Sequence, residues 1–486
     1  MRSHRSVPAL VVASLTILGF LTLAPPVAAQ PTFGLTAIPV LSTTTSDSPE
    51  DDPELIAAIE RWWAKKKEEV LGGDFDLTFG AAIRIRAENR DPVNYALANS
   101  RSAEDYTLLR TKVHVGLGVN DHLGGFIQFR DSRTWGEESP NSVLSDSEGV
   151  DLHQGYIWLK NVQELLGVET PEGVAFTIRG GRIEFPNLGD QRMFSSLDWS
   201  NIARTFDGYH FALTTAPVDV HGVLATVTED PGFNAGRDAH LYVIYVASRP
   251  ADGLECDVYA AWRNYKTDSV TGEDSVVGDL EDQTYGARAA FARADFRAML
   301  EAAFQDGKSA NDDVEAYGWV AEAGYRAKNV PYMPGLSFGW TFASGDGNPT
   351  DGDENTFKPI APFGHAYQGH YDIFAWQNGH DYYAKAIVSP CALCTVHADF
   401  HHFILDEPED SWYNAGGVAQ RTDSTGRSGR TIGSELDLYV KGTVSKRLKV
   451  WAGWSHFWRG PYVRRTGGGD TGNFLFFQGE LLFGKS

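Results

Sequence analysis

DFDLTFGAAIRIR, residues 74–86, is the stretch that decides the fold. Alternate positions in it are apolar, and the positions between them are mostly polar or charged. The apolar series is Phe75, Leu77, Phe79, Ala81, Ile83 and Ile85, and the other series contains Asp76, Thr78, Arg84 and Arg86. A repeat of two residues is the period of a β-strand, whose successive side chains point to opposite faces. The stretch therefore predicts a strand with one apolar face and one charged face.

The same alternation continues to the end of the chain and predicts eighteen strands. We place them near 74–88, 105–119, 122–132, 150–160, 174–183, 206–215, 218–228, 239–249, 254–265, 283–292, 295–305, 314–327, 334–344, 380–389, 394–405, 431–442, 446–457 and 472–483. Tight connectors alternate with long ones at 133–149, 184–205, 266–282, 345–379, 406–430 and 458–471, and the connector at 161–173 is longer than its short peers. Short turns at one end and long loops at the other are typical of outer-membrane barrels. The fold class we predict is all-β: an 18-stranded antiparallel transmembrane β-barrel over 74–486, preceded by a short N-terminal helix.

The N-terminal region carries an export signal and a separate polar segment. Residues 1–29 combine Arg2 and Arg5, an apolar core and small residues before Gln30, which is the pattern of a secretory signal peptide. An uncleaved anchor helix is the alternative, but the core is shorter than the roughly 20 residues that a span requires. Residues 30–73 form a periplasmic segment in which 54–71 predicts one amphipathic helix. This helix either rests against the barrel or membrane, or plugs the pore.

Composition excludes several classes of partner. The chain has 42 basic and 64 acidic residues, a net charge of −22, so nucleic acid is not an expected partner. Its three cysteines make no disulfide scaffold, although Cys391 and Cys394 could close a small ring in the periplasm. Together with His397 and His401 they lack the spacing of a zinc site, so we expect no metal and no cofactor. The acidic long loops could bind calcium, although residues 346–353 do not have the EF-hand spacing.

The charged face of the strands must line the lumen if the apolar face meets lipid. Closed barrels of roughly 16 to 18 strands enclose an aqueous channel. The cations on this face are Arg84, Arg86, Arg110, Lys112, Arg130, Arg179, Arg263, Arg288, Arg297 and Arg326, and the acids are Asp76, Glu88, Asp257, Glu301, Glu322, Glu435 and Asp437. One interpretation is a cationic ring that binds an anionic solute, with Arg84, Arg110, Lys112, Arg130, Arg179 and Arg288 as pore-lining residues. The other is that arginines and acids of the lumen pair with each other and only brace the wall.

Two long loops resemble the alginate-export family of outer-membrane proteins. The first carries GRIEF (181–185), GDQR (189–192), LDWSN (197–201) and RTFDG (204–208), and the second carries SGDGNPTDG (344–352), ENTF (354–357) and GHAY (364–367). The resemblance covers about 74–483. It implies an 18-stranded barrel with an electropositive constriction that passes an anionic uronate polymer outward. It also implies loop residues folded toward the lumen, namely Arg182, Arg192, Asp198, Asn201, Arg204 and Asp207.

This sequence departs from the family pattern at two places. Its last strand does not finish on an aromatic residue, since Gly484, Lys485 and Ser486 follow Phe483. Lys358 stands where relatives more often have an acid, so the solute could differ from alginate. The identity of the solute is therefore implied by the resemblance alone.

We predict an outer-membrane channel in a Gram-negative-type bacterium that passes an anionic polysaccharide or oligosaccharide by passive diffusion. The alternative is a general or substrate-selective porin for sugars or organic anions, and a barrel whose loops adhere to a partner is a third possibility. Outer-membrane lipid and periplasmic export components are the other expected partners. We expect no enzymatic activity, because Ser195 and His210, the nearest candidates for a lipid-active enzyme, lie in no nucleophile motif.

Overall fold

The computed structural model describes residues 75–96, 103–136, 149–229, 239–467 and 470–484. The chain divides into two units, 1–42 and 43–486, and all described residues belong to the second. The predicted signal peptide and the predicted helix at 54–71 lie outside the described residues. Among those residues, no helix has both the length and the apolar character needed to cross a membrane.

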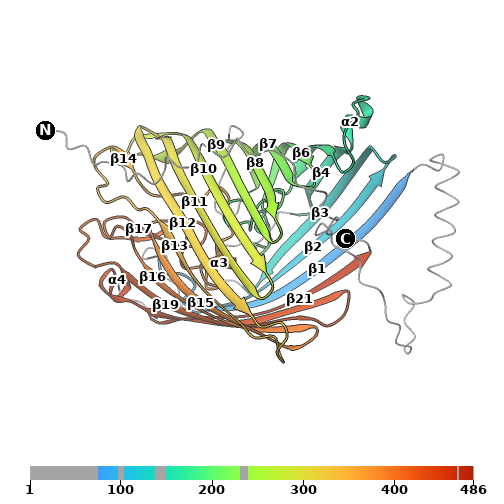
Figure 1. Cartoon of the computed structure of the whole chain (residues 1–486). Helices are drawn as coiled ribbons and strands as arrows, with labels where there is room; N and C mark the ends of the chain where they lie inside the picture. The colour runs from blue at the N-terminus through green and yellow to red at the C-terminus, as the bar shows by residue number, and fades with distance from the viewer. Residues whose placement is uncertain (1–74, 97–102, 137–148, 230–238, 468–469, 485–486) are drawn as a thin grey trace. The chain divides into compact units, whose positions relative to one another are not determined.

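Eighteen long strands form the wall of the barrel. They are β1 (Asp76–Asp91), β2 (Glu104–Gly118), β3 (Leu123–Trp135), β4 (Asp151–Leu159), β5 (Ala175–Ile183), β6 (Thr205–Thr214), β7 (Val218–Glu229), β8 (Ala239–Ala251), β9 (Leu254–Thr271), β10 (Val277–Arg293), β11 (Phe296–Ser309), β12 (Asp312–Arg326), β13 (Gly335–Ala343), β15 (Gly379–Cys391), β16 (Cys394–Ile404), β19 (Thr431–Thr443), β20 (Leu448–Arg459) and β21 (Gly472–Gly484). Each pairs antiparallel with the next, and β1 also pairs with β21, which closes the barrel. Figure 1 shows these strands as long tilted arrows that lie side by side in chain order. The predicted 18-stranded antiparallel barrel is confirmed.

The two faces of the wall carry the side chains that the alternation predicts. Phe79, Val113, Ile127 and Phe338 are exposed on the outer face, with Phe338 reaching 60%. Arg84, Arg110 and Arg130 are buried on the inner face. Because a slip of one residue would exchange the two faces, this pattern fixes the register of the strands.

Some connectors differ from the prediction. The connector expected at 266–282 is short, since β9 continues to Thr271 and β10 begins at Val277. The polar residues of this segment suggested a loop, but the two strands continue through it, and Lys266 pairs with Glu281 across them. Three of the other long loops contain short elements: β14 (Asp353–Glu354), α3 (Gly364–Tyr367), the hairpin β17 (Ser411–Tyr413) and β18 (Ala419–Thr422), and α4 (Pro461–Arg465).

Two of the long loops pack against inward-facing side chains of the wall, and together they form the apolar core inside the barrel. We call 184–204, between β5 and β6, the first inner loop, and 344–378, between β13 and β15, the second inner loop. They contact each other where Phe194 bridges Ala361 and the Ala361 N–H donates to the Met193 carbonyl at 3.0 Å. One apolar cluster centres on Phe194, Phe357 and Trp376, and another centres on Tyr371, Phe374 and Trp412. The inside of the barrel therefore contains packed loops, which strand periodicity does not predict.

Two features lie at the short-turn end. Cys391 and Cys394 form a disulfide across the turn between β15 and β16, and Cys256 is free. The long connector expected at 161–173 is present and contains α2 (Val162–Leu165).

Candidate functional site

Four cations stand opposite one another on the inner face of β1–β3. Arg84 pairs in register with Arg110, and Lys112 pairs with Arg130. We call these four residues the cationic ladder. Like charges directly opposite each other on one face repel, so the ladder needs compensation from another part of the chain.

The first inner loop supplies that compensation largely through its peptide carbonyls. The Arg84 guanidinium donates to the carbonyls of Asp198, Trp199 and Ser200 at 2.6, 3.2 and 2.9 Å. Arg110 donates to the carbonyls of Asp198 and Ser200 and forms an ion pair with the Asp198 carboxylate at 2.8 Å. These contacts hold the loop against the wall and leave both guanidinium groups buried.

The other half of the ladder uses more carboxylates. Lys112 Nζ lies 2.8 Å from Glu184 and 3.6 Å from Asp198. Arg130 pairs with Asp151 on β4 at 2.5 Å and donates to the Ile202 carbonyl. Carboxylates thus neutralise Lys112 and Arg130. Among the described residues, Arg84 donates hydrogen bonds to peptide carbonyls and forms no ion pair, although the Asp198 and Glu480 carboxylates are near enough to act on its charge.

The loop carboxylates respond to this field. The surrounding protein raises the pKa of Asp198, although its side chain is 66% exposed to the lumen, but the charges of Arg110, Lys112 and Arg84 lower the pKa by more, so it lies well below its ordinary value. Burial likewise raises the pKa of Glu184, while Lys112 and His153 bring it down to about 2. Both groups therefore stay ionised at neutral pH.

Trp199 joins the first inner loop to the wall and to the second inner loop. The Arg86 guanidinium lies 3.7 Å from the centre of its ring, and the His365 ring stacks on it with centroids 3.7 Å apart. Trp451 and Phe476 of the wall approach the ring edge to face. One aromatic side chain therefore connects three parts of the lumen.

The remaining predicted residues of the first inner loop also hold it in place. Asn201 donates to the Leu109 carbonyl at 3.2 Å, and Arg204 donates to the Ser195 carbonyl at 3.1 Å. Arg192 pairs with Asp190 and lies 3.8 Å from the ring centre of Tyr367. Arg192, Asn201 and Arg204 are buried in the packing of this loop, whereas Asp198 is exposed, so a role for the four residues in solute contact stays a prediction.

The placement of Arg182 and Asp207 toward the lumen is wrong. They pair in register on β5 and β6, where their neighbours Ile183 and Phe206 are buried on the inner face. Arg182 and Asp207 consequently lie on the outer face, beside the exposed ring of Tyr209. They form a bidentate ion pair at 2.8 and 3.0 Å. Their position in strands rather than in a loop explains the error.

Arg179 and Arg288 lie on the inner face as predicted, in different surroundings. Arg288 pairs with Glu255 and Asp257 of β9, each at 2.6 Å. Arg179 forms no ion pair with any residue that the structure describes and lies 5.8 Å from the ring centre of Tyr156. Of the lumen acids considered as braces, Glu88 pairs with Arg86, Asp257 with Arg288 and Glu322 with Arg297, so part of the lumen charge is paired within the wall as the bracing interpretation expects.

Sequence reasoning gave too little weight to cations on the inner faces of β11, β15 and β19. Arg297 was named among the lumen arginines but not chosen, and Lys385 and Lys441 were not named. The Arg297 side chain is 61% exposed although it pairs with Glu322 at 3.1 Å. Lys441 lies 4.2 Å from the ring centre of Trp451. Their alternation with apolar neighbours could have identified them, but their accessibility depends on the inner loops.

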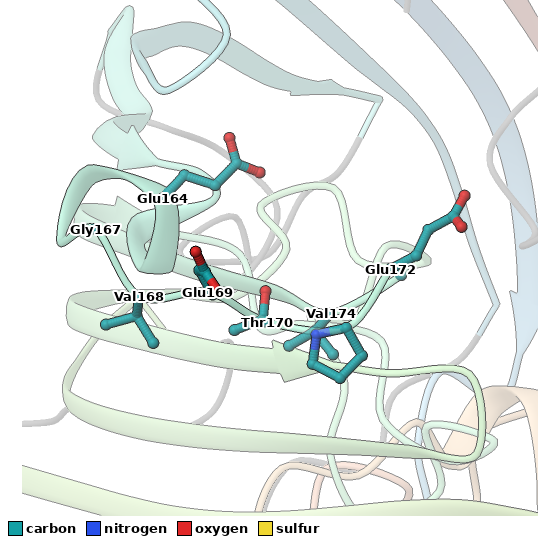
Figure 2. Close-up of a pocket in the computed structure, with 9 residues that line it drawn as sticks. Glu164, Gly167, Val168, Glu169, Thr170, Glu172 and Val174 are labelled. Atoms are coloured by element: carbon teal, nitrogen blue, oxygen red, sulfur yellow. The ribbon is translucent and has the colours of Figure 1, made fainter.

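The connector between β4 and β5 contains a separate open cavity of about 690 Å³. Figure 2 shows Glu164, Glu169 and Glu172 spread along this connector with their carboxylates apart. In the described parts of the chain, no group of three or more His, Cys, Asp or Glu residues is arranged to bind a metal ion.

The family is decided by a match that covers most of the chain. The model of the alginate export family matches residues 75–477. The chain belongs to the alginate export family. Its fold and family are those of outer-membrane channels, and the short-turn end of the barrel is accordingly its periplasmic end. Among curated proteins, no sequence matches this family member.

Solved structures support the same fold. The outer membrane protein OprD from Pseudomonas aeruginosa has a TM-score of 0.53 at 10% identity, over 84% of this chain and 94% of that chain. OccD3 (OpdP) from Pseudomonas aeruginosa has a TM-score of 0.56 at 11% identity, over 84% and 92%. OccAB4 from Acinetobacter baumannii has a TM-score of 0.52 at 9% identity, over 84% and 98%. At these identities, the likeness concerns the fold of this alginate export family member and not its solute.

Proposed function

We propose that this outer-membrane channel passes an anionic polysaccharide or oligosaccharide of the alginate type by passive diffusion, and that arginines of the lumen attract its carboxylates. The observation that carries the proposal is the cationic ladder. Arg84 in particular is bound by three peptide carbonyls and forms no ion pair with the residues that the structure describes. Hydrogen bonds to neutral oxygens leave its charge in place. A fixed positive charge in a lumen attracts anions and repels cations.

The proposal also covers the processing of the chain and the delivery of the solute. The mature chain would begin near Gln30 after removal of residues 1–29, with 30–73 as a periplasmic segment that precedes the barrel of 74–486. Periplasmic export components would deliver the solute to the short-turn end. Export and uptake use the same lumen, so direction depends on the solute gradient.

Planar bilayers test the proposal. The purified protein, in a salt gradient, should give a reversal potential of the sign for anion flow. A galacturonate tetramer should block the current at lower concentration than maltotetraose, a neutral chain of the same length. The variant Arg84→Gln/Arg179→Gln/Arg288→Gln should lose part of the anion preference, because three positive charges leave the lumen.

A matched control separates lumen charge from total charge. Arg182→Gln removes one cation from the outer face and should leave the reversal potential unchanged. Equal block by the galacturonate tetramer and maltotetraose, with no anion preference, would instead favour a general sugar porin.

A further inference from the structure

A cavity of about 550 Å³ opens in the lumen at the short-turn end. Residues of β11, β12, β13, β15, β16 and β19 surround it, and the tip of α3 reaches it through Tyr367. Its lining includes Arg297, Glu322, Lys385, Asp399 and Tyr439. We propose that this cavity is a binding subsite for one acidic sugar unit at the periplasmic mouth of the channel. The proposal rests on the proposed function, because it assumes an anionic saccharide as the solute.

Arg297 is the cation in this cavity that is best placed to bind a carboxylate. One of its terminal nitrogens lies 3.1 Å from both Glu322 and Ser337, which fixes the direction of the guanidinium. The side chain is nevertheless 61% exposed, whereas Arg84 is 3% exposed. A guanidinium has five N–H donors, so several remain available, and a carboxylate can take two of them in parallel. Arg84 could make such contacts only if the first inner loop moved away.

Two carboxylates in the cavity are positioned to accept hydrogen bonds from hydroxyl groups. Glu322 already accepts from the Tyr383 hydroxyl at 2.9 Å, and Asp399 accepts from the Tyr439 hydroxyl at 3.1 Å. A carboxylate can accept about four hydrogen bonds, so both keep acceptor capacity, and the Glu322 side chain, 18% exposed, offers more of it to the cavity than Asp399, which is 6% exposed. Lys385 Nζ lies 3.9 Å from Asp399, so the cavity contains a second cation besides Arg297.

The combination of groups selects the chemical class of the ligand. A simple anion would use Arg297 and Lys385 but would bring no donors for the acceptor oxygens of the two carboxylates. A neutral sugar would use the carboxylates and leave the exposed guanidinium unused. A uronate unit has a carboxylate for Arg297 and hydroxyl groups for Glu322 and Asp399. Tyr367 of α3 and Tyr439 of β19 also line the cavity, but the Arg192 guanidinium lies 3.8 Å from the ring centre of Tyr367 and His397 stacks on Tyr439 with centroids 4.4 Å apart, so the selectivity rests on the charged groups.

The test compares Arg297→Gln with Arg182→Gln, which removes an ion-paired arginine from the outer face. Single channels are exposed to a galacturonate tetramer, to maltotetraose or to citrate, added on each side of the bilayer in turn. A heat-modifiable gel shift of both variants confirms that each barrel is folded. We expect Arg297→Gln to raise the half-blocking concentration of the galacturonate tetramer from the periplasmic side about tenfold, the loss of one charge-assisted contact. Arg182→Gln and the maltotetraose block should stay at wild-type values.

Each other result has a defined meaning. If the galacturonate tetramer has the same half-blocking concentration for Arg297→Gln and Arg182→Gln while the wild type remains anion-selective, the subsite is refuted and the proposed function stands. If citrate blocks as strongly as the tetramer and Arg297→Gln weakens both equally, the cavity recognises charge without sugar, and the subsite is again refuted. If the tetramer blocks the wild type from neither side and the channel shows no anion preference, the proposed function itself fails.

Discussion

At the scale of single residues, hydrogen bonds to peptide carbonyls decide which arginines can reach a solute. Arg84, Arg110 and Arg130 each contact carbonyls of the first inner loop, so their charge acts through the loop rather than by direct contact. Arg297 contacts only side chains of the wall and keeps most of its surface free. The same residue type therefore serves two purposes in one lumen, attachment of a loop and access to solute.

Loss of Arg84 should release the first inner loop. Arg84→Met keeps an unbranched side chain but removes one of two donors at each of three carbonyls, since Arg110 also donates to those of Asp198 and Ser200 and Arg86 donates to that of Trp199. The expected cost is therefore about 0.5–1.5 kcal/mol for each lost hydrogen bond. We expect a lower midpoint temperature in the heat-modifiable gel shift and more frequent current fluctuations in bilayers. Arg182→Met is the control, since its ion pair on the outer face is partly exposed. Equal effects of the two variants would contradict the attachment role of Arg84.

Acid should weaken the same attachment. The pKa of Glu184 in the folded protein, about 2, lies below the ordinary value of 4.5. Its contribution to stability is therefore complete above about pH 4.5 and is lost as pH falls toward 2. Urea unfolding at several pH values should show this decrease for the wild type and a smaller one for Glu184→Gln. The same slope in both proteins would mean that Glu184 contributes nothing to it.

At the scale of elements, the two inner loops behave as one packed unit rather than as independent covers. The bridge from Phe194 to Ala361 and the Trp199–His365 stack connect loops that are far apart in the chain. Tyr367 at the tip of α3 adds a hydrogen bond to the Asp190 carbonyl. Any motion that widens the lumen at this level must separate these contacts.

Trp199→Ala tests this coupling. Truncation of a buried tryptophan removes the stack with His365 and the contact with Arg86, and large-to-small core changes of this kind cost about 3–5 kcal/mol. We expect a larger single-channel conductance, because both loops lose their common contact. Trp340→Ala, on a face that includes the exposed Phe338, should leave conductance near the wild-type value. Unchanged conductance in Trp199→Ala would show that the loops are held independently.

At the scale of the whole molecule, the closed wall depends on an unbroken apolar outer face. β1 pairs with both β2 and β21, so the barrel has no free strand edge. Every strand must then present apolar side chains outward at the same time. The register of one strand consequently constrains that of its neighbours.

A charge on the outer face should be costly at the depth of the membrane centre and tolerated at the rim. Phe338→Arg, near the middle of β13, should lower the free energy of unfolding by about 2–4 kcal/mol. Val444→Arg, in the exposed turn between β19 and β20, should cost about 0–1 kcal/mol. Refolding into lipid vesicles from urea measures both. A small effect at Phe338 would place this position outside the lipid-facing belt.

The sequence by itself determined the wall. A period of two is a local property, so the alternation from Phe75 to Ile85 fixed the strand, its two faces and, by repetition, the number of strands. Strand ends and the extension of β9 and β10 were less certain, since polar alternation in a hairpin resembles a loop.

Only the tertiary structure decided what the lumen contains. Arg84 meets the Asp198 carbonyl across 114 positions of sequence, and the Arg90 guanidinium meets the Tyr371 carbonyl across 281. No local pattern encodes such pairings, because they depend on which loop folds inward and which face each strand turns to it. For the same reason Arg297 was left out of the candidate site. Arg182 was assigned to the wrong face because it was taken as a loop residue, whereas the alternation within β5 places it outward. Accessibility of a charged side chain is a property of its neighbours in space, whereas the face of a strand on which it lies is a property of its place in the sequence.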